Sequence, residues 1–143
     1  MLSMKVYDAT DQILGRLATR IAKELLKGEN VRIVNCEKAV ISGNPKVTEK
    51  HYLERRKRGD PIHGPFYPRT PDGIVRRTIR GMLPFHKPMG RDSFRRLKVY
   101  VGVPDELKEE KFLKIKEFDV NKLKCKSISV GDLSITLGAK KRW

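Results

Sequence analysis

The residues of this chain most suited to a specific chemistry are the basic side chains of its middle third. Residues 50–100 hold 14 basic and 4 acidic side chains, against 32 and 17 in the whole chain. Arginine dominates, and guanidinium groups make forked hydrogen bonds to phosphates and stack on exposed bases. This composition indicates an RNA-binding surface. The candidate RNA-binding residues are Arg55, Arg56, Lys57, Arg58, Arg69, Arg76, Arg77, Arg80, Lys87, Arg91, Arg95, Arg96 and Lys98.

Aromatic residues and prolines are interleaved with these basic residues. Phe66, Tyr67, Phe85 and Phe94 supply rings on which a base or a guanidinium group can stack. Residues 60–72 contain four of the eight prolines, which predicts an extended excursion rather than a helix or strand. A solvated basic face would explain any one of these residues, but the whole cluster favours RNA.

No sequence motif supports catalysis or metal binding. The segment ATDQILGR, where a doubly wound sheet would hold a phosphate, contains neither a dinucleotide-binding nor a Walker fingerprint. His51, His63 and His86 lack the spacing of metal ligands, and Cys36 and Cys125 belong to no CxxC pair. We therefore expect no enzyme, no metal, no cofactor and no small-molecule substrate.

The flanking thirds contain the elements that must position the basic segment. A strand over 5–9, a helix over 14–27 and a strand over 31–35 form a unit whose length favours a right-handed parallel connection and an α/β fold. Residues 38–42 either extend this second strand or follow it. Another strand is expected over 97–101.

Three further helices are predicted, over 45–58, 72–83 and near 131–137. Asn44 and Pro45 are typical of a helix start, and Asp72 is expected to cap the second of these helices. For the helix over 14–27, Thr10 and Asp11 are the candidate caps and Gly28 the expected end. The stretch after the second proline-rich loop, PFHKPMG, reads only as a short basic segment.

Length and charge limit the classes of protein. The 143 residues fit a single domain spanning 1–143, with about 50–100 facing RNA. The formal net charge of +15 makes nucleic acid the first expected partner and an anionic membrane the second, while heat adaptation would also suit so charged a surface. There is no apolar run long enough for a membrane span, no secretory signal and no cysteine pair, so we expect a reduced, cytoplasmic protein.

Four sequence blocks, which together span most of the chain, resemble the universal large-subunit ribosomal protein L-thirteen family. They are YDATDQILGRLATRIAKELLKG, VNCEKAVISG, RTIRGMLP and GRDSFRRLKVYVGVP, in the family's order. The helix within NPKVTEKHYLERRKRG and the insertion GPFYPRTPDGI resemble the archaeal and eukaryotic branch. Because a long C-terminal extension of the eukaryotic kind is not present, the archaeal type is the closer resemblance.

The resemblance implies a three-layer α/β/α fold with a parallel sheet of about four strands. It also implies a non-catalytic constituent of the large ribosomal subunit, which binds large-subunit rRNA, supports its assembly and contacts neighbouring ribosomal proteins. Within the matching blocks it assigns RNA contact to Arg76, Arg77, Arg80, Lys87, Arg91, Arg95, Arg96 and Lys98. Two alternatives remain: a free-standing RNA-binding regulator and a nucleotide-dependent enzyme.

Overall fold

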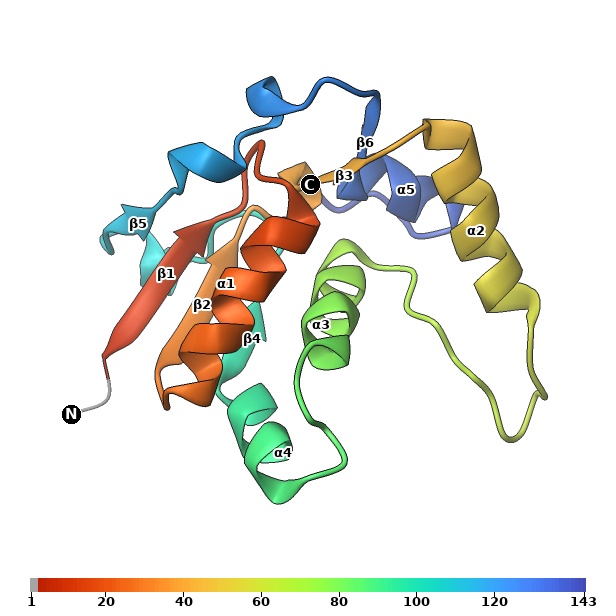
Figure 1. Cartoon of the computed structure of the whole chain (residues 1–143). Helices are drawn as coiled ribbons and strands as arrows, with labels where there is room; N and C mark the ends of the chain where they lie inside the picture. Colours follow the sequence, from red (N-terminus) through yellow and green to blue (C-terminus); the bar gives the residue numbers. More distant parts are fainter. Residues whose placement is uncertain (1–2) are drawn as a thin grey trace.

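The computed structural model describes residues 3–143 and is built around a four-stranded sheet in the order β4-β2-β1-β5 (Figure 1). Every pairing in this sheet is parallel, which confirms the predicted α/β class and parallel sheet. The strands are β1 (Met4–Asp8), β2 (Asn30–Val34), β4 (Leu97–Val99) and β5 (Phe112–Leu113).

Helix α1 (Leu14–Leu26) connects β1 to β2 and buries the apolar stripe that the sequence predicts. Gly28, with a φ of 97°, ends this segment as expected. The predicted caps are wrong, because Ile13 precedes the helix and no side chain caps it. Thr10 instead hydrogen-bonds Asp8, and Asp11 lies in a turn with a φ of 56°.

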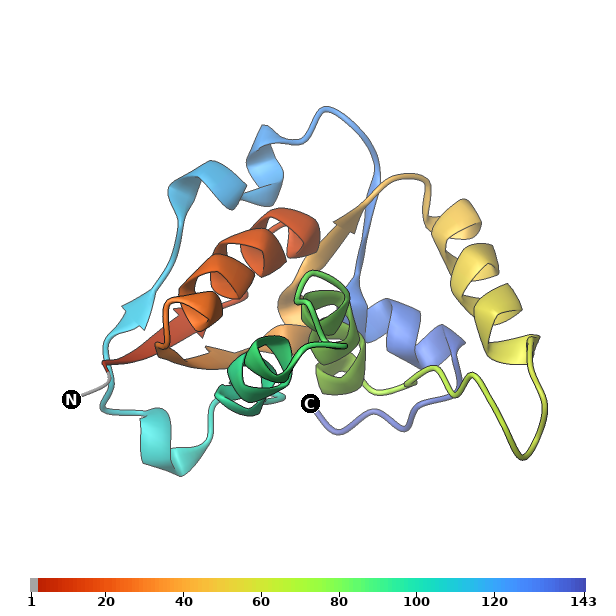
Figure 2. The same ribbon diagram turned by 60° about the horizontal axis from the view of Figure 1, so that its bottom comes forward.

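Helices α3 (Pro71–Gly81) and α4 (Pro88–Arg95) pack beside α1 (Figure 2). Thr70 precedes α3 and Pro71 is its first residue, so Asp72 lies in the first turn and is not the predicted cap. Helix α4 was not predicted. Gly90 in its interior is buried and packs closely against the Pro84 carbonyl. A Cβ atom at position 90 would collide with that carbonyl, so the position requires glycine.

A second, smaller sheet pairs β3 (Val40–Ser42) with β6 (Ser127–Ser129) in antiparallel fashion. Residues 38–42 therefore follow β2 rather than extend it. Helix α5 (Val130–Thr136) follows β6, close to the predicted position. Helix α2 (Pro45–Lys57) follows β3, and the Asn44 side chain accepts a hydrogen bond from the Lys46 amide at 3.1 Å, as predicted for a cap.

Short 3-10 helices complete the fold. They are η1 (Cys36–Lys38), η2 (Asp105–Leu107), η3 (Lys116–Phe118) and η4 (Val120–Lys122). Leu107 of η2 packs with Val6 and Val34, and so covers the sheet face that points away from α1.

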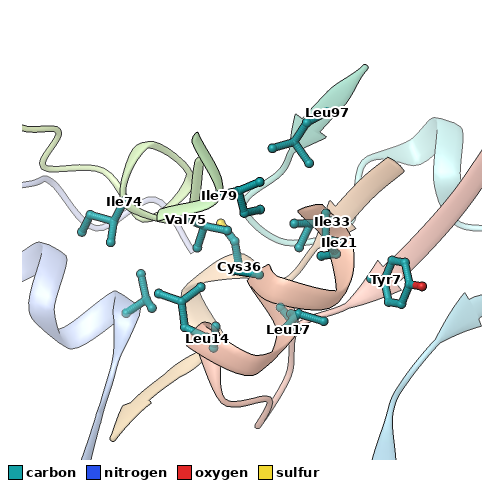
Figure 3. Close-up of a cluster of buried hydrophobic side chains, with 14 of the residues drawn as sticks. Tyr7, Leu14, Leu17, Ile21, Ile33, Cys36, Ile74, Val75, Ile79 and Leu97 are labelled. Atoms are coloured by element: carbon teal, nitrogen blue, oxygen red, sulfur yellow. The ribbon is translucent and has the colours of Figure 1, made fainter. Parts of the chain in front are cut away.

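The main core lies between α1, α3 and the sheet (Figure 3). Leu17 and Ile21 of α1 meet Ile33 of β2 and Ile79 of α3, all buried. A contiguous cluster of this kind fixes the orientation of α3 relative to the sheet. Within the described residues, no helix combines the length and the apolar character that a membrane span requires.

Candidate nucleic-acid interface

The 13 predicted RNA-binding residues carry largely uncompensated charge. Ten are exposed, and Arg56, Arg80 and Arg96 are half-buried. Among residues 3–143, only Arg95 of this set has a carboxylate partner, Asp92 at 3.4 Å. Basic residues of β1 and α1 are compensated instead, since Lys5 and Arg20 both pair with the buried Glu24. Unpaired guanidinium groups on a surface remain available to phosphates.

Helix α3 presents three of these arginines from a fixed base. Its buried face contains Ile74, Val75 and Ile79, whereas Arg76 and Arg77 are exposed. The arginines occur at helical spacings that place them away from the core side of the helix. Helix packing thus holds a row of positive charge on the surface.

Aromatic rings support the guanidinium groups on α3. The Arg76 guanidinium carbon lies 4.9 Å from the ring centre of Phe94, and that of Arg80 lies 4.1 Å from Phe85. The two rings meet edge-to-face with centres 5.7 Å apart. Because Phe94 belongs to α4, these contacts link the arginines of α3 to the basic helix beside it.

Tyr67, in the proline-rich excursion, is shared by two arginines from different helices. The guanidinium carbon of Arg55 on α2 lies 5.7 Å from the ring centre, and that of Arg77 on α3 lies 5.3 Å from it. A Cβ atom on Gly73 would collide with Pro68, so this part of the excursion packs closely against the start of α3. Residues 65–69 belong to no helix or strand, as predicted, whereas residues 60–64 form a turn closed by an Asp60–Gly64 bridge and α3 already begins at Pro71.

Two predicted residues turn toward the protein itself. Arg56 donates a hydrogen bond to the Leu137 carbonyl at 2.6 Å, and burial, helped by the nearby Arg69, lowers the pKa of Arg56. Arg96 donates to the Leu25 carbonyl at 2.7 Å and to Ser93. The structure thus gives both arginines a role in bracing the fold.

Lys98 lies on a different face from the α3 arginines. It alternates along β4 with Leu97, which is buried in the core beneath α1 and α3, so its side chain points away from that core. Its neighbour in register is Arg32 of β2, a basic residue outside the predicted set. Alternation along the two strands is the signal that could have found this pair.

Tyr52 and Arg16 lie outside the set of 13 candidate residues that the sequence predicts. Both side chains line a cavity of about 340 Å³ between α1, β3 and α2. Tyr52 lies one helical turn before Arg55, so helical spacing of an aromatic beside an arginine was the available signal.

The side chains that could bind a metal or react as thiols form no cluster within residues 3–143. No group of three His, Cys, Asp or Glu side chains within residues 3–143 could hold a metal ion. Cys36 is buried, and burial raises the pKa of its thiol far above the ordinary value. Cys125 is a free, exposed thiol.

Comparison with known proteins decides the family. The family model of ribosomal protein L13 matches residues 3–106. The chain belongs to this family. A curated relative from Methanosarcina barkeri, named large ribosomal subunit protein uL13, is 51% identical over 139 residues, covering 96% of this chain and 99% of its own length.

Two further relatives with the same name extend the likeness. The protein of Methanocaldococcus jannaschii is 47% identical over 142 residues, and that of Methanococcoides burtonii is 46% identical over 138 residues. Each comparison covers 96% of this chain and 99% of the relative. All three organisms are archaea, which confirms the prediction of an archaeal-type member of the family.

Proposed function

We propose that the chain is a structural constituent of the large ribosomal subunit, which binds large-subunit rRNA and supports its assembly in translation. The observation that carries this proposal is the row of arginines on α3. None of them pairs with a carboxylate within residues 3–143, the buried face of the helix fixes their position, and aromatic rings lie beside them. The relatives named as large-subunit proteins support the same role.

In this mechanism the protein binds RNA and catalyses no reaction. Arg76, Arg77 and Arg80 contact RNA phosphates, while the side chains of α4 and of the excursion fit the local RNA shape. Seven other candidates extend the contact on either side: Arg55, Lys57, Arg58, Arg69, Lys87, Arg91 and Arg95. Residues 1–143 act as one domain, in the cytoplasmic ribosome and beside neighbouring ribosomal proteins.

A nucleotide-dependent enzyme is disfavoured by the carboxyl end of β1, where a doubly wound sheet would bind a phosphate. Asp8 occupies this position, and its Oδ1 accepts hydrogen bonds from the Thr10 amide, the Thr10 hydroxyl and Asn35. Burial alone would raise the pKa of Asp8, but these hydrogen bonds and the nearby Lys114 lower it below the ordinary value. A carboxylate kept ionised in this way repels a phosphate.

Sedimentation of host lysate through a sucrose gradient tests the assignment to the ribosome. With the protein followed by antibody, we expect it to remain with the large subunit after a moderate salt wash. Recovery at the top of the gradient would instead support the free-standing RNA-binding regulator and contradict the ribosomal proposal.

Replacing Arg76, Arg77 and Arg80 together by Ala tests the α3 surface itself. We expect affinity for transcribed large-subunit rRNA to fall about a hundred-fold or more, because several charge-assisted hydrogen bonds are lost. The three side chains lie outside the buried face, so circular dichroism and the melting temperature should change little. Unaltered affinity in the folded variant would contradict the proposal.

A further inference from the structure

Two adjacent cavities lie between α2 and the body of the protein. The first, of about 370 Å³, is lined by residues that include Tyr52, Arg55, Tyr67 and Arg77. The second, of about 340 Å³, lies at the start of α1 and is lined by residues that include Arg16. Both cavities share Tyr52 and Thr78, so they are adjacent. We call them together the α2–α3 groove, and each has the volume of a small-ligand site.

The walls of the α2–α3 groove have the chemistry of a site for unpaired nucleotides. Ile74 gives it a buried apolar lining, and the half-buried Tyr52 and Tyr67 supply aromatic rings. Exposed arginines from three helices lie along it: Arg16, Arg55 and Arg77. Within the described part of the chain, none of these arginines has a carboxylate within ion-pair distance. Bases stack on such rings and guanidinium planes, while the charges attract the backbone phosphates.

Two glycines line the groove without a structural reason within the protein. Gly15 lies in the first turn of α1 and Gly81 is the last residue of α3, and neither has a positive φ. A Cβ atom at either position would meet nothing within 4 Å. Alanine stabilises a helix better than glycine, so folding alone favours alanine at both positions. A ligand that approaches the backbone closely gives a reason for glycine.

We propose that the α2–α3 groove binds one or two unpaired nucleotides of the RNA. Their backbone passes close to Gly15 and Gly81, and one base stacks at Tyr67, where the guanidinium groups of Arg55 and Arg77 already lie. This inference rests on the proposed function, because the occupant is a segment of the same RNA. It adds a second mode of contact, in which bases are held outside a helix, to the phosphate contacts of the α3 surface.

The glycines allow a test in which folding and binding move in opposite directions. Gly15→Ala, Gly81→Ala and the double variant should keep or raise the melting temperature. Their affinity for transcribed large-subunit rRNA of the host should fall several-fold in each single variant and further in the double variant. A role confined to folding cannot give a more stable protein that binds more weakly, whereas unchanged affinity in all three variants would overturn the proposal.

Tyr67 gives an independent test with a conservative control. Tyr67→Leu, which loses the ring, should weaken binding about ten-fold, because stacking of a base on an aromatic ring contributes about that factor. Tyr67→Phe keeps the ring and should bind like the native protein. Ultraviolet cross-linking of the native complex, read by mass spectrometry, should give a nucleotide adduct on Tyr67 or Tyr52.

The outcomes separate the groove from the proposed function. If Tyr67→Leu and the glycine variants bind normally while the α3 triple variant does not, the groove proposal fails and RNA binding stands. If the native protein does not bind the transcript, the proposed function fails. If Tyr67 gives no adduct with naked rRNA but is protected from modification in the intact subunit, a neighbouring protein fills the groove and the nucleotide proposal is overturned.

Discussion

Helices α2 and α3 carry similar charge but are held in very different ways. Helix α3 buries Ile74, Val75 and Ile79 in the main core. Helix α2 has no buried residue and stands at the edge of the molecule, beyond α5 (Figures 1 and 2). It is joined to α5 by the hydrogen bond from Arg56 to the Leu137 carbonyl and by a contact between Thr136 and Glu49 at 3.3 Å.

A count of basic residues therefore does not describe a surface that could bind RNA. In the mechanism proposed above, the α3 arginines are already oriented by the aromatic rings before RNA binds, so their binding loses little side-chain entropy. The residues at the end of α2, Arg55 to Arg58, lie on or directly after a helix that has no fully buried residue and meets the main core through the half-buried Tyr52 and Leu53. Local opening of such a segment needs less free energy than opening of the core.

The largest expected difference between the two helices is in how much a truncated side chain lowers the free energy of unfolding. Ile79→Ala should lower the free energy of unfolding by about 2–5 kcal/mol, because it leaves a cavity between α3 and α1. The control on α2 is Val47→Ala, whose side chain is 66% exposed and whose loss should change stability by about 0.5 kcal/mol or less. Urea denaturation followed by circular dichroism measures both, and equal losses would mean that α2 is as firmly packed as α3.

A smaller effect concerns RNA affinity. Arg80→Ala on α3 should weaken binding of large-subunit rRNA about ten-fold, whereas Arg58→Ala at the end of α2 should weaken it by about two- to three-fold. The reason is that Arg80 is held over Phe85, whereas Arg58 is exposed at the end of α2 and no aromatic ring within residues 3–143 orients its guanidinium group. Titration of labelled rRNA with each variant measures the two affinities, and a larger loss for Arg58→Ala than for Arg80→Ala would contradict this expectation.

The smallest effect is local. Arg56→Ala should remove one of the two contacts between α2 and the end of α5. The free energy of local opening of α2, measured by amide exchange, should fall by about 1 kcal/mol, the usual contribution of a hydrogen bond. Hydrogen exchange read by mass spectrometry should show faster exchange over 45–57 and unchanged exchange over 71–81. Arg56→Lys keeps the charge but not the fork and should recover only part of the protection.

The sequence predicts most of the elements because their signals are local. Helix α1 follows from its apolar spacing, and α2 from Asn44 and Pro45. Helix α4 was missed because Pro88 and Gly90 argue against a helix, yet Pro88 is its first residue and Gly90 is required by the neighbouring turn. Strand β5, with two residues, is too short for any period to be recognised.

The candidate site was predictable in composition but not in geometry. Its arginines are visible as a charge cluster, whereas their partners come from distant parts of the chain. Arg56 reaches Leu137 and Arg96 reaches Leu25, contacts that only the tertiary fold creates. The groove depends in the same way on Gly15 and Gly81, whose unoccupied surroundings have no signature in the sequence.

The inward hydrogen bonds of Arg56 and Arg96 have a consequence for how basic this chain must be. Leu25 lies in the last turn of α1, and Leu137 directly follows α5. Each arginine thus places a positive charge at the negative end of a helix dipole, where it stabilises the helix. Part of the net charge is therefore needed by the protein's own helices, and substitutions that made the chain less basic at these two positions would destabilise the ends of α1 and α5.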